Sequence, residues 1–231
     1  MEEKFLQVHN ISKIFNPNED IQVMGLQDID LEISQGEFVV ISGPSGSGKT
    51  TLLNIIGGLD SATTGEVILN GLRLTGLSEK ELSAQRRDHI GFVFQAYNLI
   101  PVLTARENIE YIMRLQNKSS KECESRVLEV TRKLGIEKLI DKLPNQMSGG
   151  QQQRVAVARA VACKPKLILA DEPTANLDSK TAEELMDMMQ RLNEDEQITV
   201  IFSSHDPMVI SKAKRFIVLK DGKIVTNEIA A

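Results

Sequence analysis

The sequence has few cysteines, no excess of positive charge and no long hydrophobic run, and each shortage excludes a class of protein. Cys123 and Cys163 are its only cysteines. Because they form no C-x-x-C pair, we expect neither a disulfide framework nor a zinc site. Lys and Arg number 27 against 32 Asp and Glu, a net charge of −5. The chain therefore has no net electrostatic reason to coat nucleic acid or an anionic membrane.

The hydrophobic runs are the length of strands. Runs such as Phe38–Ile41 are too short to cross a bilayer, so we expect no transmembrane helix and no direct membrane insertion. The N-terminal residues Met1-Glu2-Glu3-Lys4 lack the basic and apolar regions of a signal peptide. If the protein acts at a membrane, we expect another chain to carry it there.

Short apolar runs alternate with helical patterns over most of the 231 residues. Runs rich in Val, Ile and Phe with helices between them predict a parallel sheet. These runs are Phe38–Ile41, Ile90–Phe94, Leu167–Ala170, Ile198–Phe202 and Phe216–Leu219. In the first third, strand candidates joined mostly by Gly, Asn and Asp turns predict an antiparallel sheet beside the parallel core. These candidates are Phe5–Val8, Ile29–Ile33 and Val67–Leu69.

The stretch from Thr104 to Leu134 has no strand candidate, and its helical spacing is broken softly at Asn117–Ser120. We expect two or three helices there, inserted between core strands. The whole chain would then be a single α/β domain. In this division, residues 1–95 and 160–231 hold the core and the antiparallel β subdomain. Residues from about 96 to 159 form an inserted α-helical subdomain.

A phosphate-binding motif follows the first core strand. The pattern G-x-x-x-x-G-K-[ST] is matched by Gly43, Pro44, Ser45, Gly46, Ser47, Gly48, Lys49 and Thr50. We call these residues the phosphate loop. A helical run from Thr51 to Ile56 follows, which is the context that the motif requires. Backbone N–H groups and a helix N-terminus would face the phosphates. Lys49 would neutralise phosphate charge and the Thr50 hydroxyl would bind Mg²⁺. The alternative is a flexible glycine loop with a chance lysine.

Two carboxylates end the strand at Leu167–Ala170. Ligand sites of parallel sheets lie at the carboxyl ends of strands, which is also where the phosphate loop is expected. Asp171 is placed to hold the Mg²⁺ shell, and Glu172 is placed to polarise a water that attacks the γ-phosphate. The alternative is a solvated strand end before the turn at Pro173.

Two further polar residues follow core strands. His205 comes after the strand around Ile198–Phe202, just before the helix-start signal Asp206-Pro207. It could reach the same γ-phosphate, although a lone histidine is more often a surface or capping residue. Gln95 ends the strand Ile90–Phe94 and could orient water or reach the metal shell. By itself this residue indicates little.

A second segment has the character of a phosphate site. Residues 147–151, which we call the Ser148 segment, open a helix that continues from Gln152 to Ala162. Ser148 and Gln151 also form a capping-box pattern, so a well-capped helix is the plain interpretation. The other interpretation is an anion-binding helix N-terminus formed by Ser148, Gly149 and Gly150. Since one nucleotide does not need two cradles within one chain, we expect a dimer in which this segment closes over the partner's nucleotide.

These motifs together resemble the ATP-binding subunits of ABC (ATP-binding cassette) transporters, over essentially the whole chain. The phosphate loop, Gln95, the Ser148 segment, the Asp171-Glu172 pair, Asn176-Leu177-Asp178 and His205 occur in the family's order and spacing. Several stretches resemble the group that contains MacB, LolD and FtsE. They are Arg86–Gln95, Asn98–Pro101, Thr104–Asn108, Ser148–Ala160 and Ala170–Ser179.

The resemblance implies a P-loop ATPase that uses ATP and Mg²⁺. Phe15 would stack on adenine, where the family often has Tyr. The phosphate loop with Thr51, Gln95, Asp178 and His205 would bind nucleotide, while Ser148, Gly149, Gly150 and Gln151 would complete the partner's site. Catalysis would rest on Glu172, His205, Gln95 and Lys49. The metal would be bound by Thr50, Gln95 and Asp171.

The resemblance also implies partners and a location. A homodimer on the cytoplasmic face of the inner membrane would dock on a permease subunit that carries an extracytoplasmic domain. Two outputs stay open: a transporter that exports a substrate or releases lipoproteins, and an FtsE-like ATPase that transmits force or signals and moves no substrate. A soluble ATPase of DNA repair or translation fits poorly, because those proteins carry a long coiled coil or two cassettes in one chain. Residues that bind and hydrolyse ATP do not indicate which process the hydrolysis drives.

Overall fold

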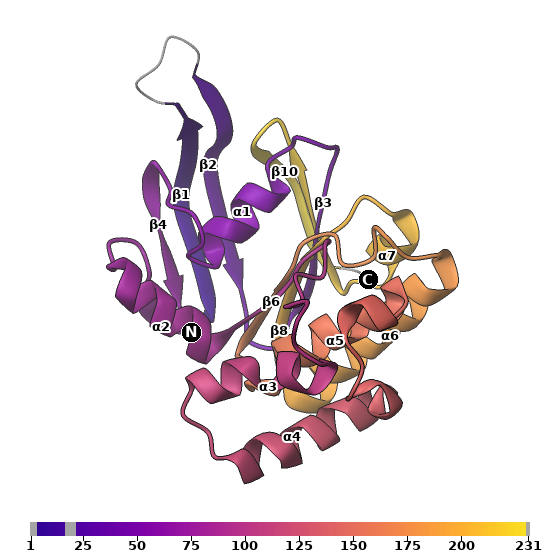
Figure 1. Cartoon of the computed structure of the whole chain (residues 1–231). Helices are drawn as coiled ribbons and strands as arrows, with labels where there is room; N and C mark the ends of the chain where they lie inside the picture. The colour runs from indigo at the N-terminus through magenta and orange to yellow at the C-terminus, as the bar shows by residue number, and fades with distance from the viewer. Residues whose placement is uncertain (1–3, 17–21, 230–231) are drawn as a thin grey trace.

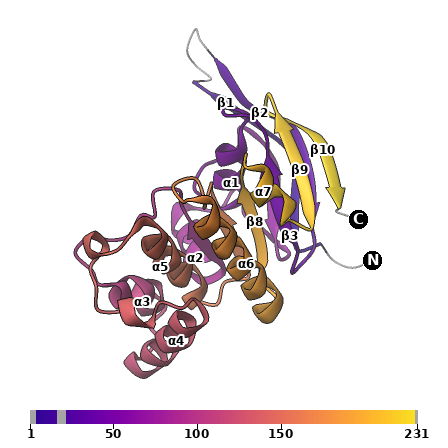
Figure 2. The same ribbon diagram turned by 90° about the vertical axis from the view of Figure 1, so that its right-hand side faces the viewer.

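The structure, a computed structural model, describes residues 4–16 and 22–229. Two sheets pack around helix α1 (Lys49–Ile56), and helices α5 (Gly149–Ala162) and α6 (Ser179–Glu196) cover the other face of the larger sheet (Figures 1 and 2). The antiparallel sheet and helices α3 (Ala105–Leu115) and α4 (Ser120–Lys133) occupy opposite ends of the molecule. This is the α/β fold that the sequence predicts.

The larger sheet has six strands in the order β10-β9-β3-β8-β7-β6. Their bounds are β3 Phe38–Ser42, β6 Ile90–Val93, β7 Leu167–Ala170, β8 Thr199–Ser203, β9 Arg215–Lys220 and β10 Lys223–Ile229. All are parallel except β10, which forms an antiparallel hairpin with β9. The five predicted core strands are therefore present, each within a residue or two of its expected bounds.

Both faces of this sheet are buried, which explains the unbroken apolar runs in its strands. Alternate residues of β3 enter different cores: Phe38 and Val40 belong to the one beneath the helices, Val39 and Ile41 to the one around α1. The second core also includes Leu26 from the antiparallel sheet. Helix α1 is thus held between two sheets, and its N-terminus is held at the carboxyl end of β3.

The smaller sheet is antiparallel, in the order β2-β1-β4-β5. Its strands are β1 Leu6–Phe15, β2 Val23–Ile33, β4 Thr64–Leu69 and β5 Leu72–Arg73. The first two are longer than predicted. Asn10 and Asp28 adopt positive φ angles of 49° and 47°, near irregularities in the register of β1 with β2 and β4. These irregularities break the apolar alternation, so the sequence pattern ends before the strand does.

The helices after α1 are α2 Glu79–His89, α3 Ala105–Leu115, α4 Ser120–Lys133, α5 Gly149–Ala162, α6 Ser179–Glu196 and α7 Pro207–Ser211. Short 3-10 turns span Glu137–Leu139 and Pro144–Gln146. Four helices begin with a complete capping box, and their N-caps are Ser78, Thr104, Ser119 and Ser148. The predicted break between two inserted helices falls between α3 and α4. Within residues 4–16 and 22–229, no helix is long and apolar enough to cross a membrane.

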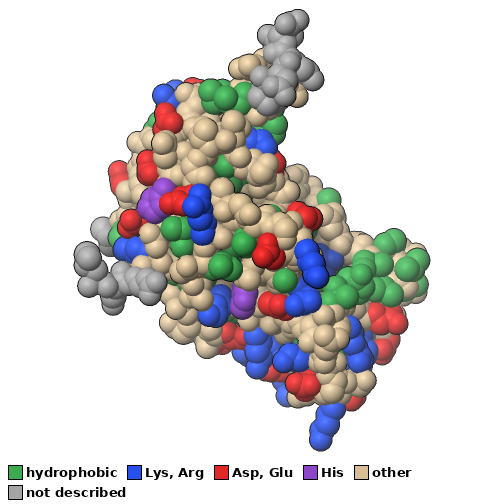
Figure 3. Space-filling view, turned by 90° about the vertical axis from the view of Figure 1, so that its left-hand side faces the viewer, with side chains coloured by type: hydrophobic (Ala, Val, Ile, Leu, Met, Phe, Trp, Pro, Cys, Tyr) green, Lys and Arg blue, Asp and Glu red, His purple; other side chains and the backbone are tan. Residues whose placement is uncertain are grey.

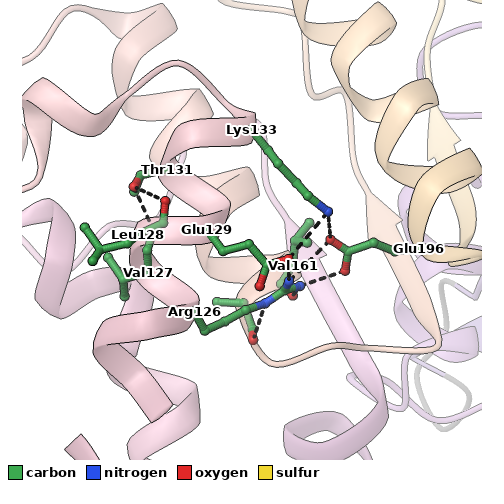
Figure 4. A network of polar contacts seen from close by, with 9 residues as sticks. Arg126, Val127, Leu128, Glu129, Thr131, Lys133, Val161 and Glu196 are labelled. Atoms are coloured by element: carbon green, nitrogen blue, oxygen red, sulfur yellow. Dashed lines mark hydrogen bonds and ion pairs between the residues drawn. The ribbon is translucent and has the colours of Figure 1, made fainter. Parts of the chain in front are cut away.

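A buried ionic network ties α4 to the C-terminal ends of α5 and α6 (Figure 4). The Arg126 side chain is only 7% exposed and donates to Glu196 Oε2 at 2.7 Å and to the Val161 carbonyl at 3.0 Å. Lys133 reaches the same carboxylate at 2.8 Å. Burial raises the pKa of Glu196, but hydrogen bonds from the two cations outweigh burial and hold that pKa below its ordinary value. The network anchors the inserted helices to the core.

Candidate functional site

The phosphate loop connects β3 to α1 and is shaped by glycines. Gly48 is the N-cap of α1, has a φ of 104° and provides no side-chain cap. A Cβ atom at Gly48 would lie 2.7 Å from the carbonyl oxygen of Gly25, and one at Gly43 would lie 2.0 Å from that of Leu219. The close neighbours exclude side chains at both positions. Because the N-cap is a glycine, no side-chain cap bonds to the N–H groups at the start of α1, as an anion site requires.

Lys49 carries a positive charge at the same place. The residue is 8% exposed, and its Nζ donates to the carbonyl oxygens of Gly43 at 2.9 Å and Pro44 at 3.0 Å. Among the described residues, no carboxylate forms an ion pair with it. The neighbouring Ser47 Oγ is buried and has no hydrogen-bond partner within the described part of the chain. A buried unpaired cation and an unsatisfied hydroxyl beside a helix N-terminus fit an anionic ligand.

Asp171 lies directly across from the start of α1. Thr50 Oγ1 donates to its two carboxylate oxygens at 3.1 Å and 2.9 Å. Ser203 Oγ, at the end of the adjacent strand β8, donates to the same carboxylate at 2.7 Å. The strand order places β8 next to β3 and β7 beyond β8, so residues 121 positions apart in the chain share one hydrogen bond. Hydroxyl and carboxylate oxygens are the protein ligands that Mg²⁺ prefers.

Glu172 and His205 form a pair at the same edge of the sheet. His205 Nδ1 lies 3.0 Å and 3.1 Å from the two carboxylate oxygens of Glu172. Glu172 has a left-handed φ of 46°, and its N–H donates to Ser203 Oγ at 2.9 Å. A non-glycine residue in this conformation costs energy and recurs at functional sites. The strained turn directs the carboxylate toward the histidine.

Residues 95–103, which we call the Gln95 loop, are fixed to the turn that precedes α6 and to helix α5. The Asn176 side chain donates to the Gln95 carbonyl at 3.0 Å. Arg159 of α5 donates to the carbonyls of Tyr97 and Asn98, which have φ angles of 60° and 48°. Burial lowers the pKa of the Arg159 guanidinium. Sequence reasoning missed Arg159, because an arginine in a helix gives no sign that it will stabilise a distant loop.

A cleft of about 640 Å³ brings many of the predicted residues together. Lining it are Phe15, Pro44, Ser45, Gly46, Gly48, Lys49, Thr50, Thr51, Gln95, Glu172 and His205. Val23, Met24 and Gly25 of β2 and Ala175 complete the wall. The sequence had given no reason to include these four. An aromatic ring, a phosphate loop and a carboxylate–histidine pair thus share one cleft.

The Ser148 segment faces a different cavity, of about 360 Å³. That cavity is lined by Ser148, Gly149, Gly150, Gln151, Arg154, Asn176, Leu177, Asp178 and Thr181. No residue lines both cavities in the described chain. Ser148 Oγ accepts from the Gln151 N–H as a capping box. Asp178 caps α6, and hydrogen bonds from the Thr181 side chain and backbone lower its pKa. The structure therefore keeps the two predicted phosphate sites of one chain apart.

A parallel sheet with a phosphate loop, an acidic pair at the next strand ends and a second capped helix N-terminus defines a P-loop nucleotide-hydrolysing cassette. A family model described as ABC transporter matches residues 26–175. The chain thus belongs to the ABC transporter family, as its motifs predict. It is the ATP-binding, ATP-hydrolysing cassette of such a system.

Relatives match over nearly the full length. The chain is 46% identical over 227 residues to the ABC transporter ATP-binding protein MJ0796 of Methanocaldococcus jannaschii, and the match covers 96% of each chain. It is 42% identical over 222 residues to the bacitracin export ATP-binding protein BceA of Halalkalibacterium halodurans, covering 96% of this chain and 87% of that one. Two dimeric structures of MJ0796, one bound to ADP and Pi, match with a TM-score of 0.90 at 45% identity, covering 97% of this chain and 98% of theirs.

Proposed function

We propose that this cassette hydrolyses ATP at two sites formed between two copies of the chain arranged head to tail. The separation of the two cavities carries the proposal. The cleft at the phosphate loop and the cavity at the Ser148 segment share no described residue, so neither encloses a triphosphate within one chain. In a dimer, Ser148, Gly149, Gly150, Gln151 and Asp178 of one copy would cover the nucleotide held by the other. The dimeric structures of MJ0796 support this arrangement.

Within one copy, the base would stack on Phe15 and the phosphates would lie in the loop from Gly43 to Thr51. Stacking suits a partly exposed aromatic ring at the rim of the cleft. Lys49 would exchange the two carbonyls that it now contacts for phosphate oxygens. Ser47 Oγ, which is buried without a hydrogen-bond partner among the described residues, fits a donor to the same phosphates.

Thr50, Asp171 and Gln95 would hold Mg²⁺. The contact between Thr50 and Asp171 supports this assignment, because it brings two hard oxygen donors together where the γ-phosphate would lie. The described residues contain no group of three acidic, His or Cys side chains that could bind a metal unaided. The ion would therefore depend on substrate phosphates for its remaining ligands, and when bound it would neutralise phosphate charge.

Glu172 would act as the general base for the attacking water, and His205 would orient its carboxylate and contact the γ-phosphate. The distances of 3.0 Å and 3.1 Å between the two side chains support a coupled pair. Gln95 would sense the γ-phosphate from the opposite side of the cleft. Gln95 and His205 are both exposed, so these side chains can adjust when a nucleotide enters.

We further propose that the Gln95 loop and α3 contact a membrane permease subunit with an extracytoplasmic domain, which would hold the cassette at the cytoplasmic face of the inner membrane. Large exposed apolar side chains support this surface: Val102, Tyr111 and Leu115. Figure 3 shows a face on which acidic and basic side chains are mixed, while hydrophobic ones gather at one edge. Residues 96–159 would then form a helical subdomain that carries the motion of this loop.

The name of BceA suggests export of bacitracin as one output. An FtsE-like output, in which force is transmitted and no substrate moves, remains the alternative. Purification of the chain with its membrane partner, and inspection of that partner's extracytoplasmic domain, would decide between them. For the hydrolytic site itself, Lys49→Ala should abolish ATP turnover and weaken nucleotide binding. An alanine variant of Lys212, a half-buried lysine that pairs with Glu183 and Asp187 away from the cleft, should keep both. Wild-type turnover in Lys49→Ala would refute the site.

A further inference from the structure

Phe15 is the last residue of β1, and its ring lines the nucleotide cleft while the residue is 38% exposed. A phenyl ring at such a rim has no polar atom that could fix its orientation. Two neighbouring residues, Lys13 and Gly25, fix the orientation of the ring instead. The Lys13 ammonium lies over the ring, 5.2 Å from its centroid. Gly25 of β2 lies at the ring edge, where a Cβ atom would be 2.5 Å from Cε2 and 3.2 Å from Cδ2.

The Lys13 ammonium is itself firmly anchored. Its Nζ donates to Asp60 Oδ1 at 2.7 Å and to the Ser61 carbonyl at 2.8 Å, just beyond the C-terminal end of α1. The Lys13 side chain is 12% exposed, and it is not among the described residues that line the cleft. The cation therefore acts on the ring and not on a bound nucleotide. A cation over an aromatic face is attracted by the ring quadrupole, more strongly where water is partly excluded.

Gly25 provides the space that the ring occupies. The backbone there does not require glycine, because Gly25 is not among the residues with positive φ. The requirement comes from the ring edge, since any Cβ atom would overlap with Cε2. Val23 and Met24, next to Gly25 on the same strand, line the cleft as well. The ring is thus held in a slot between Lys13 and Gly25 and presents its remaining surface to the cleft.

We infer that Lys13 and Gly25 are positioning residues for the purine base of the nucleotide, and that they act through the Phe15 ring. This inference rests on the proposed stacking of the base on Phe15. A ring that is ordered before binding loses less conformational freedom when the base stacks on it, so the nucleotide binds more tightly. We expect the effect at the base, because Lys13 Nζ contacts Asp60 and Ser61 and a Cβ atom at Gly25 would meet the Phe15 ring. Only the backbone carbonyl of Gly25, which a substitution at either residue keeps, lies close to Gly48 of the phosphate loop.

The experiment compares ADP, which carries the base, with inorganic tripolyphosphate, which does not. Lys13→Met removes the ammonium and keeps an unbranched chain, and Asp60 keeps its bond from the Ser61 N–H at 2.7 Å. We expect ADP to bind about fivefold more weakly, while the tripolyphosphate affinity stays unchanged. In ATP hydrolysis the KM should rise and kcat should hold, the sign of lost uniform binding. Lys13→Arg should restore ADP affinity, and Lys212→Met should leave all values unchanged.

A double-mutant cycle with Phe15→Ala tests the route of the effect. In the Phe15→Ala background, Lys13→Met should no longer change ADP affinity, because the ring through which it acts is gone. An equal loss of ADP and tripolyphosphate affinity in Lys13→Met would overturn the inference, since it would show a general structural role. Unchanged ADP affinity in that variant would overturn it too.

Gly25→Ala keeps the test decisive if Lys13→Met fails to fold. The added methyl group must displace the ring edge, so ADP should weaken and tripolyphosphate should not; equal or absent losses would again refute the inference. If Phe15→Ala itself leaves ADP affinity unchanged, the base does not stack there, and both the stacking assignment and this inference fail. The hydrolytic site would still be judged separately, by Lys49→Ala.

Discussion

Replacement of Glu172 by glutamine tests the proposed mechanism most directly. The Glu172 side chain is 15% exposed, and its main polar partner is His205. Glutamine keeps the shape, the left-handed backbone and an oxygen that can still accept from Nδ1. Because the His205 side chain is 69% exposed, the change in this contact should alter the free energy of unfolding by no more than about 1 kcal/mol. The variant should therefore fold, and any loss of activity would be chemical.

The expected loss follows from the assigned role. Removal of a general base costs about 10²- to 10⁴-fold in rate, which corresponds to about 3–5 kcal/mol in the activation barrier. The substitution also removes one negative charge that faces the triphosphate, so ATP binding should survive or strengthen. With two ATP molecules held between two copies and hydrolysis blocked, the dimer should persist as long as ATP is bound.

Light scattering after size-exclusion chromatography measures this outcome. With ATP and Mg²⁺, Glu172→Gln should elute at about twice the 25.6 kDa of one chain, and with ADP it should elute as the monomer. Adding Ser148→Arg should abolish the dimer by crowding the partner's phosphates. It also removes the N-cap of α5, which costs about 1 kcal/mol.

Ser119→Arg is the matched control for that cap. It removes an equivalent capping box from α4, outside both nucleotide cavities, and should leave the dimer intact. A Glu172→Gln protein that stays monomeric at saturating ATP, or hydrolyses at the native rate, would refute the head-to-tail mechanism and the role of Glu172.

Other consequences can be measured on the same protein. Arg126→Met should lower the free energy of unfolding by about 2–4 kcal/mol, because it removes a buried guanidinium bound to a carboxylate and to helix-end carbonyls; Arg114→Met, at an exposed pair, should change it by about 0.5 kcal/mol or less. The pKa of Glu196 is lowered from its ordinary 4.5, so its contribution to stability is complete above pH 4.5 and is lost as pH falls through the lowered value. Denaturation curves against pH should show this loss in the native chain and a smaller one in Arg126→Met. Val102→Asp, at a residue that is 78% exposed, should reduce co-purification of the membrane partner while ATPase activity and melting temperature hold. Leu99→Asp should instead lower the melting temperature, because Leu99 packs against the core.

The sequence predicts the parts of the fold whose signal is local. The phosphate loop is a contiguous motif with a required strand and helix around it, and the core strands are continuous apolar runs because both faces of their sheet are buried. Helix α2 was not predicted from the sequence, because it lacks such an apolar pattern. None of its residues is buried, so it has no apolar stripe, although the capping box of Ser78 and Glu81 marks its start.

Features that depend on distant pairs could not be predicted from the sequence. Arg126 is one of many charged residues in a helical stretch, and only the fold brings it to Glu196, 70 positions away. The strain at Glu172 arises where its N–H meets Ser203 on the neighbouring strand. The space that Gly25 leaves for Phe15 arises from the pairing of β1 with β2. Each of these contacts requires the topology before the residue acquires a role.

The contacts of the Gln95 loop imply that two nucleotide sites of a dimer are not independent. Arg159 lies on α5, the helix that begins with the Ser148 segment, and it binds the carbonyls of Tyr97 and Asn98. At the other end of α5, a Cβ atom at Gly149 would lie 2.7 Å from the Tyr97 hydroxyl, so the tyrosine and the helix start are in close apposition. If a γ-phosphate displaced Gln95 in one cleft as proposed, these contacts would transmit the displacement to the segment that is proposed to serve the other cleft. On the proposed head-to-tail arrangement, occupancy of one site changes the affinity of the other, and reciprocity requires the same coupling in return.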